Sequence, residues 1–376
     1  MSACRLQRIQ AHMVSAHLVP TWVHGCRRAC LTWCSASRQM CGHAGPEVLL
    51  ERVGNAGVIT LNRPKVLNAL TLNMIRLIYP QLKKWEADTE TSVVIIKGAG
   101  EKAFCAGGDV TAVAEAGKSG DRLVKDLFRE EYTLNNAIGT CRKPYVALIG
   151  GITMGGGVGL SVHGQFRVAT EKTLFAMPET AIGLFPDVGG GYFLPRLKGK
   201  LGLFLALTGF RLKGRDVLRA GVATHFVESE KVSVSIYGKM RMPAESVLLS
   251  QSRPVPASGM LFEATSVEGI MNNLKTDGSP FAQKQAEMLS KMSPTSLKLT
   301  LKQMQAGATM SLQEVFVMEY RLSQACMNGH DFYEGVRAVL IDKDQNPKWK
   351  PSTLEEVTEK SVEKSFQSLG EHDLRL

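Results

Sequence analysis

An uncharged stretch that begins at Tyr145 restricts the fold more than any other part of the sequence. It reads YVALI, then two glycines, then ITM, then GGGVG, and it ends at Gly159. The apolar run has the length and composition of a fully buried strand, and the glycines after it permit a very close approach of backbone. If residues 155–157 open a helix, their amides point outward at its positive end, where an anion or a developing oxyanion is stabilised.

Three other interpretations of this stretch disagree with its residues. A membrane span is disfavoured because the residues from Tyr145 to Val162 include six glycines, which weaken a bilayer helix. A nucleotide phosphate loop would need Gly-Lys-Ser/Thr after the glycines, and Val158 follows them instead. A dinucleotide-binding fingerprint would need a glycine where Val162 stands. An oxyanion-binding turn and a close-packed glycine turn are the two interpretations that are left.

The first 46 residues differ in composition from the rest of the chain. They contain no Asp or Glu, five arginines, several serines and five of the chain's eight cysteines. An Arg-rich, acid-free segment without a long apolar core is typical of a mitochondrial transit peptide. We therefore expect residues 1–46 to be a transit peptide and the protein to act in the mitochondrial matrix. Removal of these arginines would lower the formal net charge from +10 to +5.

The cysteines and histidines indicate neither a disulfide framework nor a metal site. The cysteine spacing in the first segment matches no closed zinc site. The three cysteines outside it suit a reduced compartment; they are Cys105, Cys141 and Cys326. The histidines without ligand-like spacing, for which we expect structural roles, are His163, His225 and His330.

About 330 residues follow the first segment, enough for one large domain or for one domain with a helical appendage. Residues 48–62 have the pattern of a β-hairpin. From Thr71 onward the apolar spacing predicts an amphipathic helix with Pro80 inside it. The residues on its buried face are Met74, Ile78, Leu82 and Trp85. Short strands at 93–96 and 145–149 enclose a glycine loop and a helix around 123–138, an alternation that predicts an α/β fold with buried parallel strands.

The second half of the chain is predicted to be mainly helical. Helices are expected at 190–197 and 201–207, and helical patterning resumes near Val267 and continues to about Ala338. Within it, Pro294 suits a helix start and Gly307 a break. Residues 232–260 are rich in Pro and Ser and have no apolar period, so we expect a divergent linker or insertion there. No helix or strand is assigned to the acidic tail that closes the chain.

Several motifs, in this order, resemble those of the crotonase (enoyl-CoA hydratase/isomerase) superfamily. They are NRP and NAL within residues 62–70, FCAGGD at 104–109, and a glycine at 151 followed by GGG at 155–157. Others resemble one branch, the 3-hydroxyisobutyryl-CoA hydrolases. These are FREEY at 128–132, MPE at 177–179, GLFPDVGG at 183–190 and EGVRAVLIDKD at 334–344. Each motif alone is weak, but the ordered set is specific, and it covers residues 47–231 and 262–376.

This resemblance implies a fold and an activity. The fold would be an α/β spiral of ββα units in a crotonase core at 47–231, followed by a C-terminal helical region at 261–376. The activity would be that of an acyl-CoA thioesterase that releases CoA and 3-hydroxyisobutyrate in valine catabolism, with 3-hydroxypropionyl-CoA as a second candidate substrate. CoA is part of the substrate, so no separate cofactor is implied. Neither a membrane nor a nucleic acid is an expected partner, and the oligomeric state is left open.

The resemblance also assigns roles to individual residues. The amides of Gly108 and Gly156 would form an oxyanion hole for the thioester carbonyl, and a donor held where charge develops is worth roughly 2.7 to 4 kcal/mol. Glu179 and Asp187 would be the catalytic carboxylates, and each follows a proline that stiffens the backbone. Glu179 would attack the carbonyl carbon or activate water, and Asp187 would position the substrate's hydroxyl or deliver water. The expected substrate-binding residues are Glu131, which would line the acyl pocket, Gly156, Glu179 and Asp187.

One departure from the hydratases of this superfamily discriminates between reactions. Those enzymes use two glutamates, one at the position of Glu179 and one two residues past the triple glycine, where this chain has Gly159. Hydration of a double bond needs an acid and a base that flank it, so Gly159 favours thioester hydrolysis. Two alternatives stay open. One is an enoyl-CoA hydratase or isomerase, and the other is a non-catalytic crotonase homologue that binds RNA, although no basic stripe interleaved with aromatic residues supports it.

Three further residues have ordinary structural interpretations beside functional ones. Cys105 adjoins the expected oxyanion loop, but no His neighbour is evident and a small buried filler is expected. Lys65 is a candidate contact for the CoA phosphates, with a surface lysine as the alternative. Gly150 stands where relatives carry a larger polar residue, and we expect it to loosen the floor of the acyl pocket.

Overall fold

The structure is a computed structural model that describes residues 45–232 and 261–376. The expected transit peptide up to residue 44 and the expected linker from residue 233 to residue 260 lie outside the described residues. The two described ranges belong to one structural unit.

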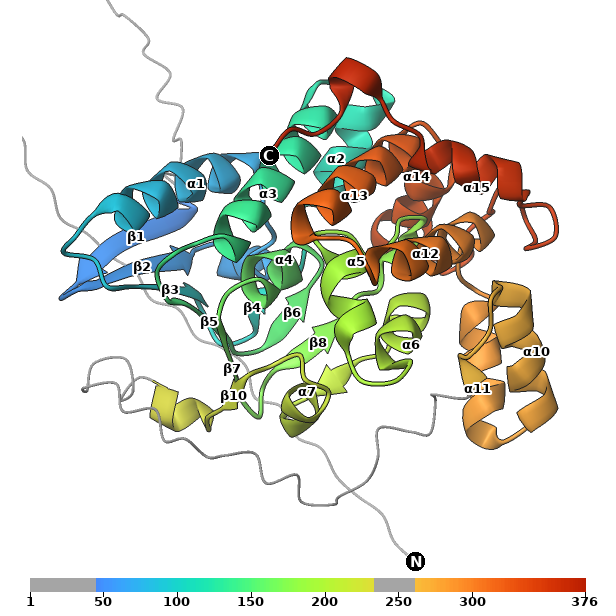
Figure 1. Ribbon diagram of the computed structural model, residues 1–376, viewed down its shortest axis with the longest axis horizontal. Helices are drawn as coiled ribbons and strands as arrows, with labels where there is room; N and C mark the ends of the chain where they lie inside the picture. The colour runs from blue at the N-terminus through green and yellow to red at the C-terminus, as the bar shows by residue number, and fades with distance from the viewer. Residues whose placement is uncertain (1–44, 233–260) are drawn as a thin grey trace, which may run out of the picture. The chain divides into compact units, whose positions relative to one another are not determined.

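Two β-sheets form the frame of the described chain (Figure 1). The larger has six strands in the order β1-β2-β3-β5-β7-β10, and the smaller has four in the order β4-β6-β8-β9. The larger sheet consists of β1 (Val48–Val53), β2 (Ala56–Leu61), β3 (Val93–Gly98), β5 (Tyr145–Ile149), β7 (Phe166–Ala169) and β10 (His225–Phe226). The smaller consists of β4 (Ala103–Cys105), β6 (Ile152–Met154), β8 (Leu174–Ala176) and β9 (Leu212–Lys213). Strands β1 and β2 form the predicted antiparallel hairpin, and the other neighbours in the larger sheet are parallel.

Strands of the larger sheet continue into short strands of the smaller one. β3 leads into β4, β5 into β6, and β7 into β8, and a helix or helical turn follows each pair. The parallel strands are largely buried, as β5 shows with four of its five residues inside, because both faces of such a sheet are covered. This repeat confirms the predicted spiral of ββα units.

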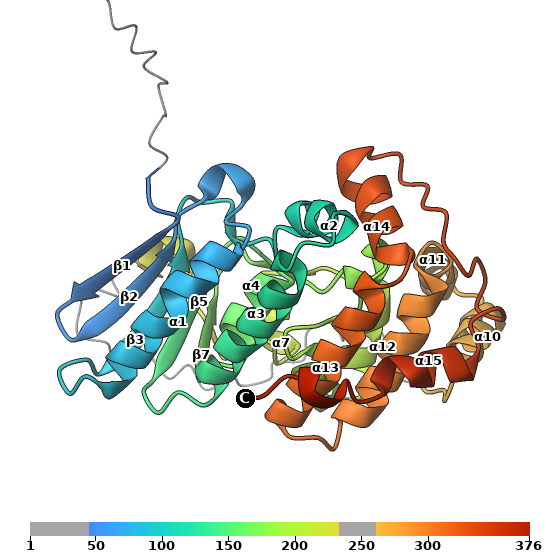
Figure 2. The same cartoon turned by 90° about the horizontal axis from the view of Figure 1, so that it is seen from above.

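Helices α1, α4 and α7 pack against strands of the larger sheet, and Figure 2 shows α1 and α3 side by side. Thr71 caps α1 by accepting the N–H of Met74 at 3.2 Å. All four residues predicted for the buried face of this helix are buried. The helices are α1 (Leu72–Ala87), α2 (Val110–Lys118), α3 (Leu123–Gly139), α4 (Gly156–Val162), α5 (Gly190–Phe193), α6 (Leu201–Thr208) and α7 (Arg215–Arg219). Three 3₁₀ turns join them, η1 (Pro64–Val66), η2 (Glu179–Ile182) and η3 (Leu194–Arg196).

The C-terminal region is helical, as predicted, and α13 lies beside α3 (Figure 2). Pro294 begins α12 after its cap Ser293, and that helix ends at the predicted break, Gly307. Ser311 and Glu314 form a capping box that starts α13. The elements are α10 (Val267–Asp277), α11 (Pro280–Leu289), α12 (Pro294–Gly307), α13 (Leu312–Met327), α14 (Asp331–Val336), the π-helical turn η4 (Arg337–Ile341), α15 (Glu359–Phe366) and η5 (Gly370–His372).

The acidic tail contains a helix, α15, that the sequence analysis did not assign. Val362 is its one buried residue, and Phe366 packs partly buried against the core. This one pair at helical spacing is too short a signal to identify a helix from the sequence. Within the ranges that the structure describes, no helix combines the length and the apolar character needed to cross a membrane.

Candidate active site

The glycine cluster forms the turn from β6 into α4. Gly155 has a φ of +45° and a ψ of −122°, a conformation that L side chains rarely adopt, and α4 begins at Gly156. A Cβ on Gly157 would lie 2.3 Å from the carbonyl oxygen of Cys105, so this glycine permits close packing against β4. Gly156 is the first residue of α4, and its N–H has no acceptor within the helix. Close packing thus explains Gly157 and leaves the amide of Gly156 as a free donor.

A second free amide, that of Gly108, lies next to the first. The N–H of Leu70 donates to the carbonyl of Gly107 at 2.8 Å, and its carbonyl accepts the N–H of Asp109 at 2.9 Å. Because peptide groups alternate in direction along extended backbone, the N–H of Gly108 points away from Leu70. A Cβ on Gly156 would lie 3.4 Å from the nitrogen of Gly108. Among the described residues neither amide donates a hydrogen bond, and two adjacent free donors can bind an oxyanion.

Two polar side chains of α3 face α4. Glu131 is 4% exposed, and its Oε1 lies 2.6 Å from the point that a Cβ on Gly156 would occupy. One turn further along α3, the amide of Asn135 lies 2.9 Å from the corresponding point on Gly159. Within the described part of the chain, Oε1 of Glu131 and both amide atoms of Asn135 have no hydrogen-bond partner. Buried polar atoms of this kind are normally satisfied by water or by a ligand.

Glu179 lies at the start of η2, directly after Pro178. Its side chain is 5% exposed, and its Oε1 lies 3.1 Å from the point that a Cβ on Gly155 would occupy. No described residue forms a hydrogen bond with its Oε2. The carbonyl of Glu179 accepts the N–H of Leu184 at 3.0 Å, which fixes the backbone of the turn. The carboxyl group is therefore held beside the glycine turn with one oxygen free to react.

Asp187 approaches from the turn between η2 and α5. It is 6% exposed, and the hydroxyl of Tyr132 donates to its Oδ2 at 2.9 Å. Tyr132 follows Glu131 directly on α3, so this helix contacts the site through two successive side chains. The sequence analysis did not single out Tyr132 or Asn135. The signal for Tyr132 was its place inside the FREEY motif, whereas Asn135 is identifiable only from the packing of α3 on α4.

The three buried carboxyl groups act on one another electrostatically. Burial and, second, the charge of Asp187 raise the pKa of Glu179 and of Glu131 well above their usual range. Burial raises the pKa of Asp187 to about 7, although the Tyr132 hydrogen bond opposes the shift. Since groups so coupled share their protons, the cluster holds both a proton donor and a proton acceptor near neutral pH. The structure thus brings together the five residues of the predicted site, namely Gly108, Glu131, Gly156, Glu179 and Asp187.

The position of the second hydratase glutamate has no room for a side chain. A Cβ on Gly159 would lie 2.6 Å from the Cβ of Val188 and 2.9 Å from the amide of Asn135. Contacts below 3.0 Å require the neighbours to move. The Cβ of Val188 is bonded directly to its backbone, so it can move only if the backbone moves. The departure noted in the sequence is therefore built into the packing of α3, α4 and the turn that carries Asp187.

The remaining candidate residues are structural or outside the site. Cys105 is buried, and burial raises the pKa of its thiol to about 12, as expected of an inert filler. The histidines contact neighbouring oxygens: His163 the carbonyl of Val188, His225 the hydroxyl of Thr224, and His330 the carbonyl of Lys348. Among the described residues no three His, Cys, Asp or Glu side chains could together hold a metal ion. Lys65 lies in η1, and its suggested contact with CoA stays a prediction.

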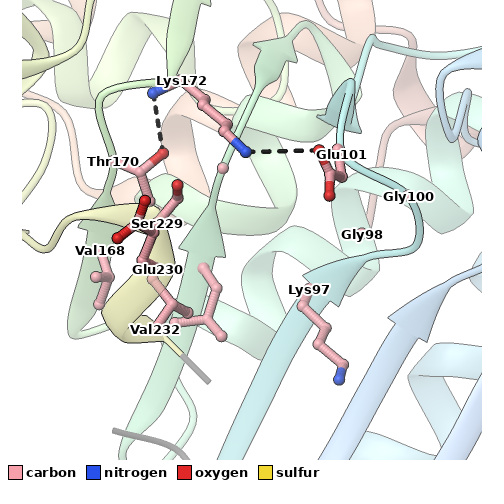
Figure 3. Close-up of a pocket in the computed structure, with 12 residues that line it drawn as sticks. Lys97, Gly98, Gly100, Glu101, Val168, Thr170, Lys172, Ser229, Glu230 and Val232 are labelled. Atoms are coloured by element: carbon pink, nitrogen blue, oxygen red, sulfur yellow. Dashed lines mark hydrogen bonds and ion pairs between the residues drawn. The ribbon is translucent and has the colours of Figure 1, made fainter. Parts of the chain in front are cut away.

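A separate cavity of about 530 Å³ lies on the other face of the larger sheet (Figure 3). Lys97, Leu148 and Val168 line it from neighbouring register positions of β3, β5 and β7, whereas the residues next to them point into the main core. Lys172 and Glu101 form an ion pair of 3.6 Å at its edge. Gly150 lines this cavity, so the expectation that it forms the floor of the acyl pocket is wrong.

Comparison with known proteins points to one family. The family described as "Enoyl-CoA hydratase/isomerase" matches residues 56–366. A relative from Danio rerio named "3-hydroxyisobutyryl-CoA hydrolase, mitochondrial" is 66% identical, with 100% of this chain and 97% of the relative covered. A human relative of the same name is 63% identical, with 88% and 91% covered.

Two solved structures extend this similarity to the fold. An enoyl-CoA hydratase from Rhodobacter sphaeroides 2.4.1 has a TM-score of 0.81 and 36% identity, over 88% of this chain and 100% of that one. A carnitinyl-CoA dehydratase from Mycobacterium thermoresistibile has a TM-score of 0.80 and 38% identity, over 86% and 97%. The sequence relatives are thus named as hydrolases, whereas the solved structures are named as a hydratase and a dehydratase.

Proposed function

This chain belongs to the enoyl-CoA hydratase/isomerase family, and we propose that within it the chain hydrolyses the thioester of 3-hydroxyisobutyryl-CoA, in mitochondria and in the breakdown of valine. The observation that carries this choice is the filled space at Gly159, where the Cβ of a glutamate would lie too close to Val188 and Asn135 unless these residues moved. Hydration needs a second carboxylate at that point, whereas hydrolysis needs a polarised carbonyl, one reacting carboxylate and water. The names of the relatives support the same substrate.

In this proposal the amides of Gly108 and Gly156 bind the thioester oxygen. The carbonyl gains negative charge as it becomes tetrahedral, and two preformed N–H donors stabilise that charge without reorganisation. The short separation between the two amides, inferred from the 3.4 Å contact at Gly156, suits donation to one oxygen.

Glu179 is the proposed nucleophile. One carboxylate oxygen attacks the carbonyl carbon, and the tetrahedral intermediate collapses with cleavage of the carbon–sulfur bond, which gives a mixed anhydride on Glu179 and a CoA thiolate that takes up a proton. Water then cleaves the anhydride and regenerates the carboxylate. The unpartnered Oε2 of Glu179 supports this role, because a reacting atom must not be tied up in the resting site.

Asp187 and Glu131 serve the substrate and the water in this scheme. The pKa of Asp187, about 7, suits proton exchange with water near neutral pH. Glu131 lines the acyl pocket, and its unpartnered Oε1 can accept a hydrogen bond from the 3-hydroxyl group. The scheme uses no cofactor other than the CoA of the substrate, and its substrate is a small molecule rather than a nucleic acid.

Thiol release tests this function directly. With 3-hydroxyisobutyryl-CoA as substrate, we expect free CoA and acid in equal amounts, and almost none from a Glu179→Gln variant that keeps the size of the side chain. A wild-type protein that liberates no CoA would refute the function. A single turnover in heavy-oxygen water separates the two roles of Glu179, because attack of water on the glutamyl carbonyl of an anhydride places the label in Glu179, whereas direct attack of water on the thioester places it only in the released acid.

A further inference from the structure

The turn that presents Asp187 has an unusual backbone. Val188 has a φ of +51°, in the left-handed region that a β-branched residue rarely adopts, and Gly189 follows with a φ of +85°. Such a conformation persists only where the surrounding structure determines it, and it is concentrated at functional sites. The groups that hold the residues from Pro186 to Gly191 therefore decide where the carboxyl group of Asp187 lies.

Glu319 of α13 is the main group that holds this turn. Its side chain is 0% exposed. Its Oε2 accepts the N–H of Gly189 at 2.7 Å, and its Oε1 accepts the N–H of Gly191 at 2.8 Å. A Cβ on Gly191 would lie 3.2 Å from Oε1, so the absence of a side chain lets the carboxylate approach. One carboxylate thus binds two amides of the turn on the C-terminal side of Asp187.

Two other side chains hold the same turn, and together with Glu319 they form a clamp on residues 186–191. Nε2 of Gln303, on α12, donates to the carbonyl of Pro186 at 2.8 Å and to Oε1 of Glu319 at 2.8 Å. His163 contacts the carbonyl of Val188 at 2.7 Å. Burial lowers the pKa of His163 to about 4, so its ring is neutral and the nitrogen that faces the carbonyl is the donor. The backbone is therefore fixed on both sides of Asp187 by side chains from three elements.

The bonding of Glu319 argues against a role in packing alone. Within the described ranges, each hydrogen-bond partner of Glu319 is a donor that belongs to the turn or to Gln303, and no cation pairs with it. A buried carboxylate without a counter-charge is a costly way to fill a core, and an apolar residue would fill it at lower cost. The carboxylate supplies two hydrogen-bond acceptors at the spacing of the two amides, which an apolar residue cannot do.

We propose that Glu319 is a positioning residue for the hydrolysis, which fixes the 186–191 turn and so holds the carboxyl group of Asp187 against Tyr132 and beside Glu179. This proposal rests on the proposed function for its kinetic consequences, but its structural part does not. Glu319 does not contact the reacting groups; it acts through the backbone that it binds.

The Glu319→Gln variant tests this role. Glutamine keeps one acceptor but turns an NH₂ group toward one of the two amides, so one hydrogen bond is replaced by a contact between two donors. We expect kcat to fall about 10- to 100-fold through misplacement of Asp187, with little change in KM. Burial raises the pKa of Glu319 itself to about 8, although the hydrogen bonds from Gly189 and Gly191 oppose the shift, so its charge is small below neutral pH and the acidic limb of the kcat/KM profile should stay in place. The ionisable groups that face this region are Asp187, Glu179, Tyr132, Glu131 and His163.

Glu314→Gln is the matched control. It is the same substitution on the same helix, at the exposed capping box, where glutamine also serves, and we expect wild-type kcat and an unchanged pH profile. If Glu319→Gln does not fold, Gln303→Met removes the donor to Pro186 and to Glu319 instead, and a lower kcat at constant KM is again expected. Wild-type kcat in a folded Glu319→Gln variant would overturn the proposal.

Amide hydrogen exchange tests the role of Glu319 independently of the proposed hydrolase activity. The amides of Gly189 and Gly191 should exchange faster in Glu319→Gln than in the wild type, and at equal rates in Glu314→Gln. If the wild type releases no CoA, the proposed function is wrong, but the exchange rates still show whether Glu319 holds the turn. If exchange at both glycines is unchanged in Glu319→Gln, the clamp is wrong whatever the activity.

Discussion

Substitution of Gly156 by alanine tests the proposed oxyanion hole. The added methyl group would lie 2.6 Å from Oε1 of Glu131, 3.3 Å from Cδ2 of Leu70 and 3.4 Å from the nitrogen of Gly108. The first contact is too short, but it involves the end of a flexible side chain, which can move. The methyl group therefore stays where the thioester oxygen has to bind, between the two proposed donors.

The expected fall in kcat follows from the loss of one hydrogen bond to the thioester oxygen. Loss of one oxyanion donor raises a barrier by about 2.7 to 4 kcal/mol, which is a fall of about 10² to 10³ in kcat. Overpacking costs about 1 to 3 kcal/mol of folding free energy, and we expect the lower end here because Glu131 can rotate. Activity should thus fall much more steeply than stability.

Thiol release and thermal denaturation, measured on the same preparation, distinguish these effects. Gly150→Ala is the control, because a Cβ on that residue would meet only Oγ1 of Thr170, at an ordinary contact distance of 3.9 Å. A folded Gly156→Ala variant with near-wild-type kcat would refute the oxyanion hole. A loss of activity matched by a loss of folded protein would trace the effect to packing instead.

Three further predictions concern the carboxyl cluster and its surroundings. Glu179→Gln should abolish hydrolysis but leave binding of the CoA thioester largely intact, as measured by calorimetry; turnover at the wild-type rate would remove Glu179 from the chemistry. Gly159→Glu should gain no hydratase activity and should lower the unfolding temperature, because the new side chain meets Val188 and buries an unpaired charge; a stable variant that hydrates crotonyl-CoA would contradict the packing argument. Burial raises the folded-state pKa of Asp187 to about 7, above its ordinary value of 3.8, so the folded state binds more protons between those values and stability should fall as pH rises from about 4 to 7. Asp187→Asn should flatten that slope in thermal melts recorded across this pH range, and an unchanged slope would show that the carboxyl group is not buried as described.

Much of the fold was predictable because local patterns and tertiary packing agree. The helix that begins after Thr71 has a full apolar face and a side-chain cap, and the structure has it as predicted. α15 was not assigned, since its apolar face consists of only Val362 and Phe366, too few residues to establish a helical period. Gly150 was placed wrongly because sequence does not show which face of a sheet the residue after a strand lines.

The residues of the candidate site were predictable where they lie in motifs, and not where they act through packing. Gly108, Gly156, Glu179 and Asp187 each stand in a glycine- or proline-containing motif with a recognisable order. Glu319 is 130 residues away from Gly189 in the chain, and only the packing of α13 against the turn reveals that it binds there. Long-range contacts of this kind leave no periodic signal in one sequence.

Parallel assays of two substrates test the central claim most directly. One preparation of the protein is given 3-hydroxyisobutyryl-CoA, with release of CoA thiol followed, and crotonyl-CoA, with loss of the enoyl absorbance followed. We predict rapid thiol release from the first and negligible hydration of the second, because the amides of Gly108 and Gly156 and the carboxyl group of Glu179 are present whereas Gly159 has no space for a second acid. Hydration of crotonyl-CoA faster than release of CoA from 3-hydroxyisobutyryl-CoA would contradict the hydrolase and favour a hydratase.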